Sequence, residues 1–335
     1  MTGQSHLVFR CDASPYMGTG HAMRCLTLAN VWRDEFGGTA SFCCAEIAAN
    51  LEDRIKNHGH LVIQVDNDAQ SQDGAETLVH IASSQNARAI IIDGYQFDKG
   101  YRAPLAAAPF NVVSFRDAGS ETFGANIVID TAPHASAPKK SAAVYLCGPS
   151  YALVAPHILE ARRPESAPKG ILITFGGSDP HLLSAPVAKA IRNALPDIPI
   201  HVVLGGGVEN AAEISRELSR IPIVSVSHDV PSLGAAIVGA ELVISAAGSS
   251  LYEVAALARP MILAITEDNQ SALGALNWAE TIDVRSNADG PQLIADATAR
   301  LYRNKTLITE LGTRASTVVD GNGARRILER ILSLG

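Results

Sequence analysis

The stretch MGTGHAMRC, residues 17–25, places two glycines, a histidine and an arginine directly before a predicted helix. Gly18 and Gly20 allow the backbone to turn tightly and to come close to a ligand. His21 follows at the expected first turn of the helix, where free N–H groups and a positive partial charge favour an anionic ligand and disfavour a protonated imidazole. A neutral imidazole is what a general base requires. Asp12, at the end of the preceding strand, is expected to orient one ring nitrogen and to contribute to substrate binding.

Local features also leave His21 open to another interpretation, a capping or merely exposed histidine. The spacing lacks the third glycine of the dinucleotide-binding fingerprint and the Gly-Lys-Ser/Thr ending of a phosphate-binding loop. The other histidines are scattered in the sequence, without metal-ligand spacing, and no serine lies in a G-x-S-x-G motif. We therefore predict no metal and no cofactor, and an activated water rather than a covalent intermediate if the reaction is a hydrolysis.

The motif TFGGSDP, residues 174–180, runs from a predicted strand into a predicted helix. Gly177 and Ser178 would offer bare backbone and a hydroxyl group to a substrate. Asp179 or Ser178 could equally cap the helix, and Pro180 suits a first turn, so a purely structural turn is the alternative interpretation.

A third motif, ISAAGSSLYE at residues 244–253, begins a helix with small residues and hydroxyl groups, which suit a diphosphate. The residues concerned are Gly248, Ser249 and Ser250. Glu253, in the first turn, can accept hydrogen bonds from a vicinal diol such as ribose, or it can simply complement the helix dipole. Asn269 and Gln270 follow the next predicted strand, and Tyr95 follows a strand in the first half. We predict that these residues all bind substrate.

Short apolar runs alternate with amphipathic segments along the whole chain, a pattern typical of βαβ units and parallel sheets. Strands are predicted at 7–12, 39–44, 61–65, 89–92, 111–115, 126–129, 143–146, 171–174, 200–204, 222–226, 241–244 and 261–264. Helices are predicted at 21–36, 46–57, 74–84, 99–107, 180–194, 208–219, 231–237, 250–258 and 270–280, and throughout the tail from 290 with a break at 321–323.

The chain has 335 residues, of which 47% are hydrophobic, enough for two domains of ordinary size. We predict an α/β fold of two Rossmann-like domains, residues 1–160 and 171–335, joined by a Pro-containing linker at 161–170. Their parallel sheets are expected to face a central cleft, with ligands at the carboxyl ends of the strands.

Composition indicates which classes of partner and which cellular compartment to expect. The formal charge of −7 argues against a nucleic-acid partner, and the five cysteines show no disulfide or zinc spacing. The first residues do not resemble a secretion signal, and no run of 18 apolar residues occurs. We expect a cytoplasmic protein with reduced thiols and no membrane partner, acting as a monomer or weak dimer.

In order along the chain, these motifs resemble the UDP-2,4-diacetamido-2,4,6-trideoxy-β-L-altropyranose hydrolases of pseudaminic acid biosynthesis (the PseG family). The matching stretches are FRCDAS with MGTGHAMRCLTLA, IIIDGYQ, LCGPSYALV, ITFGGSDP, and ISAAGSSLYEVAALARP with NQ. The first stretch is specific to these hydrolases, whereas the last is shared more widely with GT-B glycosyltransferases.

The resemblance implies a GT-B fold, with UDP held mainly by the C-terminal domain. It also implies a metal-independent attack of water on the anomeric carbon, with inversion, that releases UDP and a free 2,4-diacetamido-2,4,6-trideoxyhexose. That sugar would serve nonulosonate biosynthesis and flagellin glycosylation. By the same resemblance His21 is the general base, Glu253 belongs to the UDP site, and Tyr95 lies near the substrate.

Four positions depart from the family pattern. Arg116 stands in place of one member of an aspartate pair, Asp130 and Ala132 replace asparagines, and Ala155 replaces a substrate-contacting arginine. These departures bear on which sugar the protein takes more than on the identity of the nucleotide or of the general base. Two other functions stay open. A GT-B glycosyltransferase that uses a UDP-sugar donor also fits the C-terminal motif, and a non-catalytic nucleotide-sugar binder would fit the departures at Arg116, Ala132 and Ala155.

Overall fold

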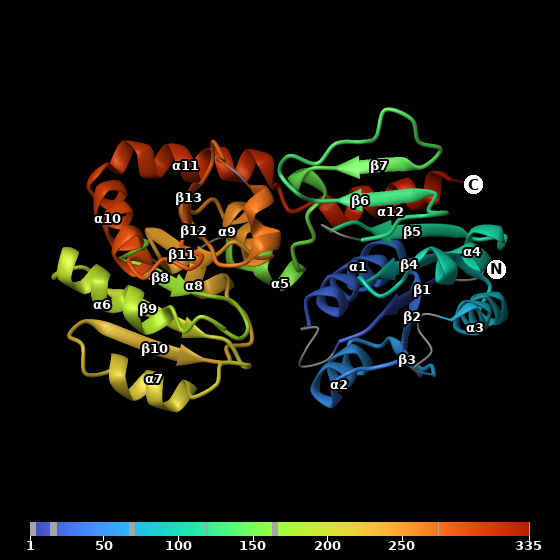
Figure 1. The fold of residues 1–335 in the computed structure, drawn as a ribbon, viewed down its shortest axis with the longest axis horizontal. Coiled ribbons are helices and arrows are strands. Elements are labelled where there is room, and N and C mark those ends of the chain that lie inside the picture. Colours follow the sequence, from blue (N-terminus) through green and yellow to red (C-terminus); the bar gives the residue numbers. More distant parts are fainter. Residues whose placement is uncertain are drawn as a thin grey trace. The chain divides into compact units, whose positions relative to one another are not determined.

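A computed structural model describes residues 5–13, 19–66, 71–117, 120–162, 167–273 and 275–334, with only the backbone described at 269 and 272. The chain forms two compact units, the first made of Met1–Leu153 with Asn322–Gly335 and the second of Val154–Gly321. Each unit is built on one parallel sheet with helices packed against it (Figure 1). The predicted α/β class with two Rossmann-like domains is confirmed.

The first unit holds a seven-stranded sheet in the order β3-β2-β1-β4-β5-β6-β7. Its strands are β1 (His6–Cys11), β2 (Thr39–Cys44), β3 (Leu61–Gln64), β4 (Ala87–Asp93), β5 (Asn111–Phe115), β6 (Ile127–Asp130) and β7 (Val144–Cys147). Its helices are α1 (Gly20–Phe36), α2 (Ala49–Asn57), α3 (Gln72–Ser84), α4 (Lys99–Ala107) and α12 (Gly323–Ser333). The strand order reverses direction between β1 and β4, which is where such sheets open a crevice at their carboxyl edge.

Alternate residues of the central strand β1 fill different cores, because successive side chains of a strand point to opposite faces. Leu7 and Phe9 pack with side chains of α1 and α12, and Phe9 stacks on Phe42 with ring centroids 4.9 Å apart. Val8 points the other way, into a core formed with α3 and α4. The strand is therefore buried on both faces, as the apolar run Leu7–Phe9 at its centre indicates.

The second unit holds a six-stranded sheet in the order β10-β9-β8-β11-β12-β13. Its strands are β8 (Ile171–Thr174), β9 (Ile200–Leu204), β10 (Val224–His228), β11 (Leu242–Ala246), β12 (Met261–Ile265) and β13 (Glu280–Asp283). Its helices are α5 (Pro156–Leu159), α6 (Ser184–Ala194), α7 (Ala211–Leu218), α8 (Gly234–Gly239), α9 (Ser250–Ala256), α10 (Gly290–Arg303) and α11 (Lys305–Val318). The reversal here falls between β8 and β11.

The predicted strands agree with these bounds to within two residues, but three features of the second half differ from the prediction. The helix predicted at 270–280 is a short 3₁₀ segment, Asp268–Leu273, and β13 begins at Glu280. Strand β13 was not predicted, because a short, half-exposed edge strand lacks the apolar run of a buried one. Helix α6 also begins later than expected, at Ser184, so Pro180 precedes it.

The division into units differs from the predicted boundaries. It falls after Leu153, and α12 belongs to the first unit although it was assigned to the second domain. The physical reason is burial: Ile327, Leu328 and Ile331 are fully buried in the core that α1 also lines. Figure 1 shows this red helix beside the blue and teal elements of the first unit. Residues 163–166 of the predicted linker lie outside the described residues.

The five cysteines are free, as predicted, and four of them are fully buried in the first unit. The longest of the described helices, α1, has 17 residues. Within the part of the chain that the structure describes, no helix combines the length and apolarity needed to cross a membrane.

Candidate functional site

Asp93 lies at the carboxyl edge of the first sheet, where the strand order reverses between β1 and β4. It is the last residue of β4, is fully buried, and is paired with Cys11 in the register between β1 and β4. His21, Arg24 and Cys25 of α1 have i, i+3 and i+4 spacing and so share one face of the helix. All three side chains reach the Asp93 carboxylate. Three side chains from about one turn of α1 thus contact the buried Asp93 carboxylate.

The contact between His21 and Asp93 fixes how the imidazole carries its proton. Nδ1 of His21 lies 2.7 Å from Oδ1 of Asp93. Burial acts to raise the pKa of Asp93, but the charge of Arg24 and the hydrogen bonds from Arg24 and His21 outweigh it, so the pKa lies below its ordinary value. An ionised carboxylate only accepts hydrogen bonds, so Nδ1 must donate. The neutral ring then has its lone pair on Nε2, the tautomer that a general base needs.

Tyr95 covers one side of the His21 ring. The two rings meet edge to face, with centroids 5.1 Å apart and planes at 84°. The His21 side chain is 13% exposed, whereas Tyr95 is 51% exposed at the surface. Gly20 begins α1 with open space where a Cβ would lie, and Gly18 lies outside the described residues. The structure therefore places Tyr95 against His21, and Gly20 directly precedes the histidine in α1.

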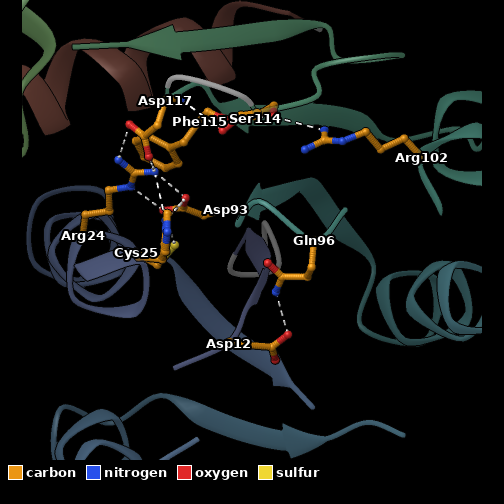
Figure 2. A network of polar contacts seen from close by, with 11 residues as sticks. Asp12, Arg24, Cys25, Asp93, Gln96, Arg102, Ser114, Phe115 and Asp117 are labelled. Atoms are coloured by element: carbon orange, nitrogen blue, oxygen red, sulfur yellow. Dashed lines mark hydrogen bonds and ion pairs between the residues drawn. The ribbon is translucent and has the colours of Figure 1, made fainter. Parts of the chain in front are cut away.

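Arg24 clamps two carboxylates with its guanidinium group (Figure 2). Nε and Nη2 donate to the two oxygens of Asp93, each at 2.5 Å, and Nη1 and Nη2 donate to the two oxygens of Asp117 at 3.1 and 2.7 Å. The guanidinium carbon also lies 4.6 Å from the centroid of the Phe115 ring. Helix α1 is thereby tied to the carboxyl ends of β4 and β5.

Asp12 does not orient His21, contrary to expectation. Its Oδ1 accepts from Arg10 at 2.6 Å and from the backbone N–H groups of Ala45 and Glu46, and its Oδ2 accepts from Gln96 at 2.8 Å. Figure 2 shows the Asp12–Gln96 bond apart from the Asp93 cluster. The carboxylate is thus committed to holding β1, β2 and the loop after β4 together.

Sequence reasoning missed Asp93, Arg24 and Asp117 as site residues. Two signals were present: Asp93 and Asp117 follow predicted strands, and Arg24 lies three residues after His21. What the sequence does not show is that β1 neighbours β4, which in turn neighbours β5. That strand order brings side chains that are far apart in the chain into hydrogen-bond contact.

Two glycine-rich loops meet at the carboxyl edge of the second sheet. The N–H of Gly207, after β9, donates to the carbonyl of Gly177, after β8, at 2.9 Å. A Cβ on Gly205 would lie 2.4 Å from the carbonyl oxygen of Gly176, so only glycine allows this approach. Gly177 itself is exposed with open space beside it. The loop after β9 was not predicted to belong to the site.

The neighbouring residues Ser178 and Asp179 have different roles. Ser178 is exposed, whereas Asp179 is 2% exposed. The Asp179 carboxylate accepts from the backbone N–H groups of Leu183 and Ser184 at 2.9 and 3.0 Å. It caps the start of α6, which supports the structural interpretation for that aspartate.

The start of α9 carries the other predicted nucleotide-binding residues. Gly248 and Ser249 are exposed and Ser250 is half-buried, and the Ser249 side chain makes no cap hydrogen bond to the helix. Burial raises the pKa of Glu253 to about 7. Its carboxyl group is therefore only partly ionised at neutral pH.

Gln270 has a local role. Its Oε1 accepts from the backbone N–H groups of Thr266 and Glu267 at 2.8 and 3.2 Å and so closes the loop after β12. Asn269 lies in the adjoining 3₁₀ segment, and its side chain is outside what the structure describes.

Two of the departures from the family pattern pair with each other. Nε of Arg116, after β5, donates to Oδ2 of Asp130, at the end of β6, at 2.7 Å. Oδ1 of Asp130 accepts from the backbone N–H of Ala132 at 3.1 Å. Arg116 also lies over the Tyr145 ring, 5.1 Å from its centroid. The fourth departure, Ala155, precedes α5 in the second unit.

Solved structures of similar fold include MurG of Acinetobacter baumannii, with a TM-score of 0.68 at 15% identity over 98% of this chain and 99% of that one. HepE of Anabaena in complex with UDP-glucose has a TM-score of 0.61 at 12% identity, covering 98% of this chain and 100% of that one. A structure described as a UDP-N-acetylglucosamine 2-epimerase of Listeria monocytogenes has a TM-score of 0.64 at 12% identity, covering 99% and 96%. These similarities confirm the GT-B-like fold.

No protein-family model matches the chain. Among curated proteins, MJ1062 of Methanocaldococcus jannaschii, of uncharacterized function, is 22% identical over an alignment of 268 residues that covers 75% of this chain. The match covers 54% of MJ1062, so this chain spans about half the length of that relative.

Proposed function

We propose that this protein hydrolyses a UDP-linked 2,4-diacetamido-2,4,6-trideoxyhexose to UDP and the free sugar. The observation that carries the proposal is the His21–Asp93 pair at the crevice position of the first sheet. A buried, ionised carboxylate holds Nδ1 of the imidazole and leaves the lone pair on Nε2. That arrangement suits the removal of a proton from water.

In the proposed reaction, Nε2 of His21 takes a proton from water as the water oxygen bonds to the anomeric carbon. The bond between that carbon and the diphosphate oxygen breaks, and UDP leaves from the opposite face, so the anomeric configuration inverts. Asp93 stabilises the imidazolium that forms and does not itself take the proton. The imidazolium then releases its proton to solvent, which restores the base.

We assign the UDP part of the substrate to the second unit. The exposed backbone at Gly177 and the start of α9 at Gly248–Ser250 offer N–H groups and hydroxyls suited to a diphosphate. Glu253 is assigned to the ribose diol, because a carboxylate accepts two hydrogen bonds from adjacent hydroxyls. Several solved structures of similar fold are complexes with UDP or UDP-glucose, which supports this assignment.

The acylated sugar is proposed from the order of the motifs that resemble the pseudaminic acid hydrolases. Arg116 and Asp130, which differ from the family pattern, occupy each other in an ion pair. Because the two side chains neutralise each other, the pair itself carries no net charge at the carboxyl edge of β5 and β6. This is compatible with a neutral diacetamido sugar.

A glycosyl transfer is the second candidate. It is favoured by structures of similar fold that are named as glycosyltransferases, such as one from Rickettsia africae with a TM-score of 0.64. In that case His21 would deprotonate an acceptor hydroxyl instead of water. Release of UDP by the purified protein without any acceptor would decide in favour of hydrolysis.

The test is incubation with UDP-2,4-diacetamido-2,4,6-trideoxy-L-altrose in water enriched in oxygen-18, followed by mass spectrometry. We expect the label on the sugar; label on UDP would contradict attack at the anomeric carbon.

His21→Asn should reduce UDP release by a factor of about 10² to 10⁴ while UDP still binds in calorimetry. His80→Asn, which changes an exposed histidine of α3, is the control and should release UDP normally. Binding of the UDP-sugar without turnover in the unmodified protein would instead indicate a nucleotide-sugar binder.

A further inference from the structure

We propose that Arg24 permanently occupies a latent divalent-cation site formed by His21, Asp93 and Asp117. Each of these three residues offers a ligand atom, and the three atoms all lie within 4.8 Å of one another. A histidine nitrogen with two carboxylate oxygens is a donor set that zinc accepts in proteins. The proposal concerns the role of Arg24 and does not depend on which substrate the protein uses.

The guanidinium group fills the space that a metal ion would take. Four of its five N–H donors reach the two carboxylates, counted from the bonds of Nε, Nη1 and Nη2 to Asp93 and Asp117. Nη2 also lies 3.2 Å from Nδ1 of His21, so the guanidinium group is close to all three candidate ligands. Figure 2 shows the arginine between the two acids.

Electrostatics explains why a cation must be present there. Asp93 is fully buried and Asp117 is 30% exposed, so two negative charges lie close together with little water around the first. Buried charges are tolerated when they are paired and hydrogen-bonded. Arg24 supplies the counter-charge from within the chain.

An arginine suits this position better than a lysine would. Its planar fork can grip two carboxylates at once and can stack on an aromatic ring, as Arg24 does on Phe115. A lysine would keep the charge but could not hold both acids in the same geometry. Arg24 is therefore a positioning residue: it aims Oδ1 of Asp93 at His21 and keeps a metal ion away from the imidazole.

The test measures zinc binding by calorimetry in the full chain, with Co²⁺ absorption as a second probe of the ligand field. We expect the original protein to bind neither ion at this site. Arg24→Ala should bind Zn²⁺ at least about tenfold more tightly than the original protein, because the three ligands lose their internal cation. Arg24→Lys is the matched control: it retains a positive charge and should not gain the metal.

A double variant locates the metal. Asp117→Asn in the Arg24→Ala background should abolish the gain, because it removes one ligand. Arg24→Met, which retains an apolar stem of similar length, serves if the alanine variant does not fold. Equal zinc binding by the original protein and by Arg24→Ala would overturn the proposal, and so would a folded alanine or methionine variant that binds no zinc. These readouts involve no UDP-sugar, so failure here and failure of the proposed hydrolysis are separate results.

Discussion

At the scale of single residues, the Asp93 carboxylate explains why His21 has a defined tautomer. Its two oxygens receive contacts from His21, Arg24 and Cys25. Each contact comes from α1, so the helix that carries the imidazole also fixes the group that orients it. A merely exposed or capping histidine, the alternative left open by the sequence, would not have a buried acid on its Nδ1.

Replacing Asp93 by asparagine should disable the proposed general base while the imidazole ring of His21 stays in place. The amide nitrogen can donate to Nδ1, which moves the imidazole proton to Nε2 and leaves no lone pair for water. We expect kcat for UDP release to fall by about 10³-fold, with a smaller change in KM. Steady-state kinetics on protein whose fold is verified by circular dichroism measures this. Asp34→Asn, on the exposed face of α1, is the control, and a folded Asp93→Asn variant with kcat within tenfold of normal would refute the assignment.

The sequence could predict His21 but not its partner. The histidine follows glycines at a strand-to-helix junction, a local pattern visible in a few residues. Asp93 lies 72 residues further along the chain, and its contact with His21 depends on β4 returning to pair with β1. Local periodicity predicts that strands exist and does not specify which strands are neighbours.

At the scale of elements, the first turn of α9 holds the Glu253 carboxyl group where burial disfavours its ionised form. Burial raises the pKa of Glu253 from 4.5 to about 7. Between these two values the folded protein retains a proton that the unfolded chain has lost. The stability gained from this proton is complete below pH 4.5 and disappears as the pH rises through about 7.

Urea unfolding at about pH 5 and about pH 8 should show this loss. We expect the original protein to lose about 1–3 kcal/mol more than Glu253→Gln over that interval, a range that allows for partial exposure of the side chain. Glu213→Gln is the matched control, because Glu213 occupies the first turn of α7 but is exposed. Identical pH dependence in the original protein and in Glu253→Gln would show that this carboxyl group is not desolvated.

The close contact between the loops after β8 and β9 leads to a second prediction at this scale. Gly205→Ala places a Cβ against the backbone of Gly176 and Gly177, so the loops must separate. We expect a loss of about 1–3 kcal/mol of unfolding free energy, together with weaker UDP binding in calorimetry. Gly239→Ala, where a Cβ meets nothing within 4 Å, should change neither quantity by much. Unchanged stability in Gly205→Ala would mean that the loops do not require close contact.

The elements that sequence reasoning found and missed differ in burial. Buried strands such as β4 and β8 are apolar runs, and such runs were recognised wherever they occur. Strand β13 has the sequence ETID and lies at the edge of its sheet, so it carries no apolar run. The range expected to be a helix, 270–280, contains instead the end of a 3₁₀ segment and the first residue of that strand.

At the scale of the whole molecule, α12 completes a core that begins more than three hundred residues earlier in the chain. Leu328 is fully buried in that core, which also contains Phe9 and Trp32. The sequence could predict the helix and the break before it, but a chain of helices after the last predicted strand gives no indication of which sheet each one covers. The boundary between units was therefore misplaced.

Leu328→Ala should destabilise the first unit and leave the second intact. Removing a fully buried leucine side chain costs about 2–5 kcal/mol. In native-state hydrogen exchange read by mass spectrometry, we expect faster exchange in β1 and α1 and unchanged exchange in β8 and β11. Leu332→Ala, on the partly exposed face of the same helix, is the control. Faster exchange in the second unit instead would place α12 with that unit.

The return of α12 to the first unit also sets an order of events during protein synthesis. Residues 154–321 form one uninterrupted segment, so the second unit has all its parts before α12 leaves the ribosome. Helix α1, with His21, Arg24 and Cys25, packs against α12, so the core on that face of α1 is complete only after α12 has been synthesised. The unit whose translation begins first is thus the last to receive all of its elements. A nascent chain that stalls before residue 322 would carry a complete set of proposed nucleotide-binding residues. The core behind α1, the helix of the proposed general base, would still lack α12.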